Sequence, residues 1–325
     1  MNAIRQYEFG PAENLRFEVF ADPQPAEGQV AIAVEAAGVH VIDLSIRRGI
    51  QMGPFPLPAL PMTPGREVAG TVDALGPGVD ERWLRRRVVG HLGQAGGGYA
   101  ERAVAPVEAL HELGDGVGAE QAVAMIGTGR TAMAILEAGA ITAQDTVLVT
   151  AAAGGIGTLL LQAALAAGAG VVGVAGGPEK VAHVRALGAT VAVDYREAGW
   201  EGAVTAALDG RGVSLAFDGV GGAVGRGALT LLAPTGRLVV FGFSSGEPTA
   251  LTTADVLGGR TVTGSLGARI TQRPGGIRDL ERQALAALAD GTLTPALQRF
   301  PLADAAAAHT ALAARATTGK VVLLP

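Results

Sequence analysis

The residues best suited to chemistry lie in a turn of small side chains near the middle of the chain. Ala152, Gly154 and Gly157 follow the dinucleotide pattern G-x-G-x-x-G, with alanine in the first place. Glycine lets a backbone approach a phosphate closely, and the N–H groups at a helix start attract the anion. The turn predicts a pyrophosphate site formed by Gly154, Gly155, Ile156 and Gly157, although close packing in a glycine-rich chain could produce the same letters.

The segments around this turn favour the binding interpretation. An apolar run at 146–150 precedes it, an Ala/Leu-rich segment follows as far as Ala167, and a second apolar run occupies 171–174. This order of strand, glycine turn, helix and strand is a βαβ unit, the setting in which a helix N-terminus holds a dinucleotide. The sequence therefore predicts a nucleotide-binding domain in this part of the chain.

The end of the second strand indicates which nucleotide binds. NAD-binding chains usually carry an acidic residue about 20 positions after the turn, where it holds the ribose 2′-hydroxyl. Here the strand ends in Gly176 and Gly177, and Lys180 follows in the next predicted helix. A glycine-lined pocket beside a cation suits a 2′-phosphate, so we predict NADPH, with Gly176 and Lys180 in its site. An ordinary solvated lysine is the alternative reading of Lys180.

Composition excludes several classes of function. The chain has 325 residues, which suggests about two domains. It has no cysteine and therefore no disulfide or thiolate metal site. A formal net charge of −5 argues against nucleic-acid binding. Since there is no leader pattern and no long uninterrupted apolar run, we expect a cytoplasmic protein without a membrane partner.

Two kinds of pattern follow each other along the chain. Short alternating strands are predicted at 15–19, 29–36, 67–74, 87–91 and 99–105, separated by proline and glycine. From about residue 119, strands alternate with helices and give six strands by residue 265. We predict an α/β fold with a Rossmann doubly wound parallel sheet at 121–261, and a β-rich catalytic domain at 1–120 that is completed by 262–325.

These motifs, in this order, resemble the medium-chain dehydrogenase/reductase superfamily, and within it the zinc-independent NADPH:quinone oxidoreductase branch. The resemblance covers nearly the whole chain and is carried by Ala37-Gly38-Val39-His40 followed by Asp43, Pro64 to Gly70, Gly76 to Val79, Gly97 to Glu101, Ala151 to Gly157, Asp194 to Glu197, Asp218 to Gly222 and Gly319 to Leu323.

The resemblance implies a GroES-like first domain, NADPH as cofactor and a homodimer. It also implies further cofactor residues: Thr131, Tyr195, Gly219, Phe241, Gly242 and Ser244. Two of these have independent support, because Gly219 and Phe241 follow predicted parallel strands, and ligands bind at the carboxyl ends of such strands.

The same resemblance indicates whether the site could bind a catalytic zinc ion. Zinc enzymes of the superfamily use cysteines, one of them at or beside position 40, and a histidine where this chain has Arg66. A catalytic zinc needs about three protein ligands. His40 and Glu67 alone leave the set incomplete, so we predict a metal-free site.

Without a Lewis acid, a plain alcohol is a difficult substrate, whereas a quinone or an α,β-unsaturated carbonyl accepts hydride with less help. His40 replaces the branch's usual asparagine, and Ser45 and Gln51 replace two tyrosines. We expect His40 to be the proton donor. A purely structural His40, an enoyl-thioester reductase of polyketide type and a non-catalytic NADPH-binding protein are the alternatives.

Overall fold

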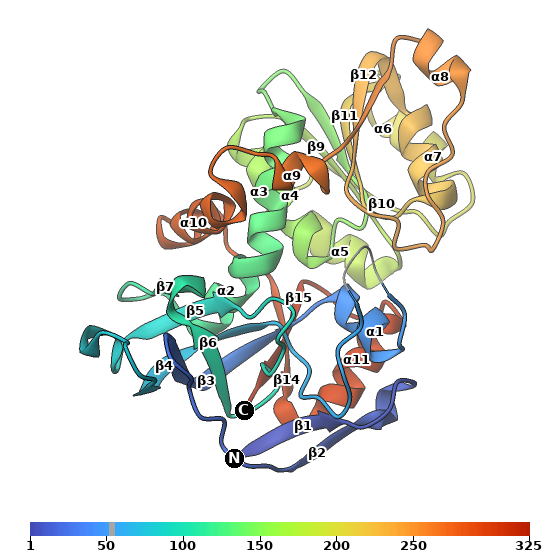
Figure 1. Ribbon diagram of the computed structural model, residues 1–325. Helices are drawn as coiled ribbons and strands as arrows, with labels where there is room; N and C mark the ends of the chain where they lie inside the picture. The colour runs from blue at the N-terminus through green and yellow to red at the C-terminus, as the bar shows by residue number, and fades with distance from the viewer. Residues whose placement is uncertain (52–55) are drawn as a thin grey trace. The chain divides into compact units, whose positions relative to one another are not determined.

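The computed structural model describes residues 1–51 and 56–325 and divides the chain into two compact units (Figure 1). Unit 1 comprises Met1–Thr128 and Pro295–Pro325, and unit 2 comprises Gly129–Thr294. The predicted boundaries at 120 and 262 therefore differ from those of the structure. Residues 121–128 stay in unit 1, because the helix Ala119–Ala124 packs on its sheet and residues 125–128 follow that helix directly. Residues 262–294 stay in unit 2 because they supply its last strand and a helix packed on its first helix.

Unit 1 is built on an antiparallel sheet that the C-terminal segment completes. Its main path runs β14-β15-β3-β4-β5-β7, with β6 paired to β3, and β1 and β2 form a separate pair. The strands are β1 Asn2–Gln6, β2 Leu15–Val19, β3 Gln29–Val39, β4 Glu67–Leu75, β5 Arg87–His91, β6 Arg102–Pro106, β7 Leu110–Glu112, β14 Leu297–Pro301 and β15 Lys320–Leu324.

The helices of unit 1 are short and connect or cover these strands. They are α1 Val41–Arg47, α2 Ala119–Ala124 and α11 Ala305–Ala313, with single 3₁₀ turns η1 Ala12–Asn14, η2 Glu81–Trp83, η3 Val107–Ala109 and η5 Leu302–Asp304. The core combines β-branched residues of the sheet, such as Val30, Val68 and Val321, with Ala305 and Ala308 of α11. This explains why the last 31 residues belong with the first domain.

Unit 2 contains the doubly wound parallel sheet. Its strand order is β10-β9-β8-β11-β12-β13, and every pair is parallel. This order is the classical dinucleotide-binding arrangement, and it confirms the predicted fold class. The strands are β8 Thr146–Val149, β9 Gly170–Ala175, β10 Val191–Asp194, β11 Val213–Asp218, β12 Leu232–Val240 and β13 Thr261–Gly264.

Helices cover both faces of this sheet, because alternate residues of a strand point to opposite sides. Val147 and Val149 pack with residues of α4 and α5, whereas Leu148 packs with residues of α6 and α7. No helix in the described ranges is both long and apolar enough to cross a membrane. The π-helical turn η4 Met125–Gly129 ends at the first residue of unit 2. The helices of unit 2 are α3 Arg130–Gly139, α4 Gly155–Ala166, α5 Pro178–Ala186, α6 Trp200–Ala207, α7 Gly222–Thr230, α8 Thr253–Leu257, α9 Ala268–Thr271 and α10 Gly276–Ala289.

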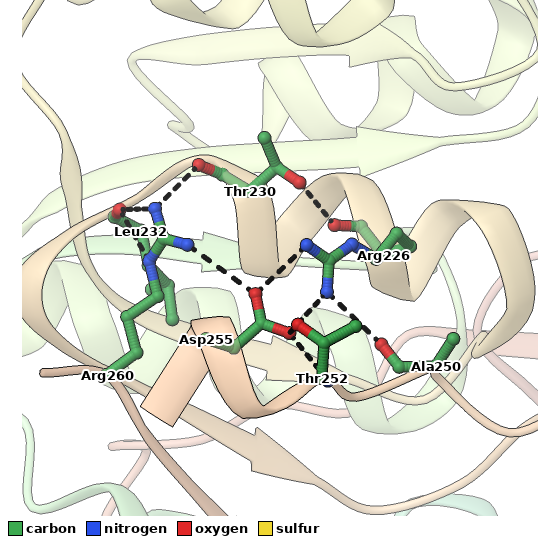
Figure 2. A network of polar contacts seen from close by, with 7 residues as sticks. All are labelled: Arg226, Thr230, Leu232, Ala250, Thr252, Asp255 and Arg260. Atoms are coloured by element: carbon green, nitrogen blue, oxygen red, sulfur yellow. Dashed lines mark hydrogen bonds and ion pairs between the residues drawn. The ribbon is translucent and has the colours of Figure 1, made fainter. Parts of the chain in front are cut away.

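The short helix α8 is held by one buried carboxylate (Figure 2). Asp255 accepts two hydrogen bonds from Arg226 of α7, at 2.6 and 2.9 Å, and lies 3.7 Å from Arg260. Its Oδ2 also accepts the Thr252 N–H at 2.8 Å in a capping box at the start of α8. The paired arginine and the capping bonds compensate the burial of Asp255, which is 3% exposed.

Candidate functional site

The glycine turn lies between β8 and α4, as predicted. Gly154 is the N-cap of α4. A Cβ atom on Gly157 would overlap the Ala151 carbonyl oxygen and lie 2.8 Å from Ala152 Cα, so only glycine lets the helix pass this close to the turn. The first turn of α4 has no acidic residue. Its N-terminal dipole is therefore available to an anion.

The structure brings Gly176 and Tyr195 together at the ends of β9 and β10. The Tyr195 N–H donates to the Ala175 carbonyl at 3.1 Å. A Cβ on Gly176 would lie 3.0 Å from Tyr195 Oη. Gly177 is the N-cap of α5 with φ +102°, and Lys180 lies in the first turn of that helix. These predicted residues share the carboxyl edge of the sheet.

A buried carboxylate organises the loop after β11. Asp218 is fully buried and accepts hydrogen bonds from Thr150 Oγ1 at 2.8 Å and Thr249 Oγ1 at 2.7 Å. It also accepts the backbone N–H groups of Val220 at 2.9 Å and Gly221 at 3.2 Å. A buried carboxylate needs such partners, and here they fix the loop that contains Gly219. Sequence reasoning noted Asp218 within a motif but did not predict this role, which depends on residues distant in the chain.

The remaining predicted cofactor residues gather at the ends of β11 and β12. The ring of Phe241 occupies the space where a Cβ on Gly219 would be. The Ser244 N–H donates to the Gly219 carbonyl at 3.0 Å, and Gly242 lies between Phe241 and Ser244 in this loop. Thr131 is in the first turn of α3, a helix that packs on β11 and β12. Open α/β sheets bind ligands at this carboxyl edge.

His40 lies in unit 1, in a cluster of charges that is almost completely buried. It is the N-cap of α1, and its Nε2 faces Glu67 Oε1 in an ion-pair contact. Lys320 Nζ donates to Glu67 Oε2 at 2.9 Å. The side chains of Glu67 and Lys320 are 0% and 4% exposed, but that of His40 is 23% exposed. The imidazole is therefore the member of the cluster that a substrate can reach.

The neighbourhood of Glu67 keeps it ionised. Burial alone would raise the pKa of Glu67, but His40 and Lys320 outweigh burial and hold that pKa well below its usual range. A Cβ on Gly38 or on Gly127 would overlap one of the Glu67 carboxylate oxygens. Gly127 belongs to the π-helical turn η4, and its missing side chain leaves the space that the carboxylate fills.

A second buried polar group supports α1 from behind. Asp43 Oδ2 accepts the His40 N–H at 2.8 Å and the Tyr99 hydroxyl at 3.2 Å. Since Tyr99 donates to Asp43, neutral His309 donates its Nε2–H to the Tyr99 oxygen, 3.1 Å away. Burial raises the pKa values of Asp43 and Tyr99 and lowers the pKa of His309 to about 3, with Arg47 adding to the last effect.

The position that holds histidine in the zinc enzymes has another role here. Arg66 Nε donates to the Gly93 carbonyl at 2.9 Å. Within residues 1–51 and 56–325, no three His, Cys, Asp or Glu side chains are grouped so that they could hold a metal ion.

Family models and individual relatives place the chain in the same protein family. Residues 26–115 match the alcohol dehydrogenase GroES-like domain, and residues 155–286 match the zinc-binding dehydrogenase domain. A quinone oxidoreductase of Pseudomonas aeruginosa is 35% identical over 327 residues, covering 98% of this chain and 97% of that protein. A 2-haloacrylate reductase of a Burkholderia species is 30% identical over 340 residues, covering 100% of this chain and 99% of that protein.

Solved structures agree with the sequence comparisons. A mycobacterial protein, solved as a complex with NADPH, has 35% identity and a TM-score of 0.84, with 100% of both chains covered. Identity at this level over whole chains shows common ancestry. The chain belongs to the quinone oxidoreductase-like family of the medium-chain dehydrogenase/reductase superfamily.

Proposed function

We propose that this protein is an NADPH-dependent reductase that transfers hydride, without a metal ion, to an electron-poor acceptor such as a quinone or an α,β-unsaturated carbonyl compound. Relatives named for quinones support the acceptor class, and so does a relative named for 2-haloacrylate, an activated alkene. The observation that carries the proposal is the cluster of Glu67, Lys320 and His40, in which the imidazole alone is substantially exposed.

The carboxyl edge of the unit 2 sheet fits NADPH, which when bound supplies the hydride. The α4 N-terminus accepts the pyrophosphate, since Gly157 allows close approach and no acidic residue opposes the anion. Gly176 lies beside Tyr195 at the end of β9, and Lys180 would supply positive charge for the ribose 2′-phosphate. The loops after β11 and β12 are fixed through Asp218 and hold the remaining part of the cofactor.

The donor set in unit 1 does not fit a catalytic zinc. Glu67 is committed to the ammonium of Lys320 at 2.9 Å, and Arg66 to a backbone carbonyl. A cationic lysine and arginine at these places would repel a divalent cation, and the chain contains no cysteine. An acceptor that stabilises its own developing charge is consistent with such a site.

We assign the proton donor role to His40. As hydride adds to a carbon of the acceptor, negative charge develops on the acceptor oxygen, and His40 gives that oxygen a proton. Ionised Glu67 is in ion-pair contact with the imidazole, and Lys320 helps to keep Glu67 ionised. Because Nε2 is buried against Glu67, the proton has to leave through the other ring nitrogen, Nδ1.

The deciding experiment follows loss of the reduced-nicotinamide absorbance with a quinone, an enone, 2-haloacrylate and an enoyl thioester, each with and without a metal chelator. Turnover of a quinone or an activated alkene that survives chelation is the expected result. Turnover restricted to the thioester would favour the polyketide-type alternative. NADPH binding without any turnover would indicate a non-catalytic protein, and zinc-restored activity would contradict the metal-free assignment.

We further propose that the protein forms a homodimer through unit 2. Among the described residues, β13 is the last strand of the parallel sheet, and the outer edge of a terminal strand can pair with another sheet. Next to it in the chain, Val256 and Leu257 of α8 are 67% and 83% exposed. The outer edge of β13 and the exposed apolar residues of α8 could together form an interface with a second copy of the chain.

A further inference from the structure

We infer that Arg196 is a second cation that recognises the ribose 2′-phosphate and thereby selects NADPH over NADH. This inference rests on the proposed function, since it names a residue for the cofactor that we propose. Sequence reasoning placed Lys180 and Tyr195 in this part of the site and gave Arg196 no role there.

The first support is where the Arg196 side chain lies. A Cβ on Gly176 would be 2.9 Å from Arg196 Nε, and a Cβ on Gly177 would be 3.3 Å from Arg196 Nη1. The guanidinium therefore lies against the glycine pair that ends β9. The end of this second strand is where dinucleotide-binding sheets distinguish a ribose hydroxyl from a ribose phosphate, and arginine is the residue that accommodates the phosphate.

The second support is that the backbone of Arg196 is fixed. Its N–H donates to Asp194 Oδ1 at 2.9 Å. The preceding residue, Tyr195, donates its N–H to the Ala175 carbonyl at 3.1 Å, and Asp194 is in register with Ala175 across β10 and β9. The turn that carries the guanidinium is thus attached to the strand end that it faces. A preorganised cation loses less conformational entropy on binding.

The third support is charge. Across residues 1–51 and 56–325, the structure gives the Arg196 guanidinium no hydrogen bond or ion pair, and the residue is exposed. An arginine without a carboxylate partner keeps its full charge for a ligand, and its planar fork matches two phosphate oxygens. The glycine pair beside it has no acidic side chain that could hold a ribose hydroxyl in place of a phosphate.

The test measures nucleotide binding rather than turnover. Titration calorimetry compares 2′,5′-ADP, which has the 2′-phosphate, with 5′-AMP, which lacks it. Arg196→Gln should weaken 2′,5′-ADP binding about ten-fold or more, and change 5′-AMP binding by less than about two-fold. The substitution leaves the backbone bond to Asp194 in place. Arg211→Gln is the control, because Arg211 is exposed and bonds a backbone carbonyl before β11, at the opposite edge of the sheet.

The outcomes separate this inference from the proposed function. If Arg196→Gln binds 2′,5′-ADP as tightly as the wild type, while Lys180→Ala does not, the assignment of Arg196 is wrong and NADPH binding stands. Equal weakening of both nucleotides would reduce Arg196 to a structural residue and also overturn the inference. If the wild type binds neither nucleotide, the proposed function itself fails.

Discussion

Two carboxylates that contact His40, those of Glu67 and Asp43, determine what it can do. Glu67 holds one ring nitrogen, and Asp43 accepts the His40 backbone N–H, so the imidazole is fixed at the start of α1. A residue fixed in this way can act repeatedly with one geometry. The purely structural alternative predicts no effect on turnover beyond that of lost stability, which makes the two readings separable by mutation.

His40→Ala should lower kcat by about 10² or more, because general acid catalysis contributes about 10²–10⁴-fold. NADPH affinity should stay nearly unchanged, since the cofactor residues belong to unit 2. Steady-state kinetics and a separate binding titration make the measurement. His40→Gln, which keeps a hydrogen-bond donor, is the comparison variant, and undiminished turnover in the alanine variant would leave His40 a structural role.

Lys180→Ala should weaken NADPH about ten-fold and NADH much less, because one charge-assisted contact to the 2′-phosphate is lost. Dissociation constants for both cofactors, measured by fluorescence, provide the check. Lys320 is unsuitable as a control because it forms an ion pair with Glu67. Substitution of the exposed Arg211 is the control here, as in the nucleotide titration. An equal loss for both cofactors would refute the phosphate assignment.

The buried His309 should make unit 1 less stable in acid. Its pKa falls from 6.5 in an exposed ring to about 3 when folded, so between these values the unfolded chain binds a proton that the folded chain does not. Stability from this group is complete above pH 6.5 and decreases as the pH falls toward 3. Going from pH 7 to 5 should cost the wild type about 2 kcal/mol more than His309→Gln.

Urea denaturation at the two pH values measures this difference. Tyr99→Phe, which keeps His309 but removes its hydroxyl partner, should retain the acid sensitivity at a lower overall stability. If the wild type and His309→Gln lose the same stability on acidification, His309 is not the responsible group.

The part of the candidate site that could be predicted consists of residues close together in the sequence. The residues that sequence analysis missed come together only through the fold. The glycine turn could be predicted because its residues are neighbours in the chain and their spacing is a motif. Lys320 lies 253 positions from Glu67, and no pattern in a single sequence connects them. Arg196 was missed for a related reason, since only the pairing of β10 with β9 brings it to Gly176.

Helices and strands with a clear periodic pattern of apolar residues could be predicted. Elements whose formation depends on one specific side-chain contact could not. The six parallel strands follow from apolar runs between helices. Helix α1 was not predicted, because it has seven residues and depends on the capping box of His40 and Asp43. Helix α7 ends at Thr230, because β12 already begins at Leu232 and includes Pro234 beside a register irregularity.

Helix α8 should depend on Asp255 for its order. Asp255→Ala removes the capping bond at the helix start and the paired bonds from Arg226 (Figure 2), so α8 should exchange its amide hydrogens faster by about ten-fold or more. Hydrogen exchange followed by mass spectrometry resolves this segment. Asp290→Ala, at an exposed residue after α10, is the control, and unchanged exchange in α8 would show that packing alone holds it.

For the whole molecule, the two units are expected to carry separate functions. Unit 1 contains the cluster that we propose as proton donor, and unit 2 contains the proposed nucleotide site, the outer edge of β13 and α8. Variants of unit 1 should therefore leave nucleotide binding, which we assign to residues of unit 2, largely intact. Assembly through unit 2 should accordingly be separable from the chemistry of His40.

Leu257→Asp tests that assembly, because it puts a charge on the apolar face of α8. Light scattering after size exclusion should give the wild type about twice the chain mass of 32.6 kDa, and the variant about the mass of a single chain. Leu84→Asp is the matched control, since Leu84 is an exposed leucine of unit 1. A variant that remains dimeric would place the interface elsewhere, and a monomeric wild type would contradict the homodimer, whereas the glycine turn and Arg196 would still bind nucleotide in a single chain.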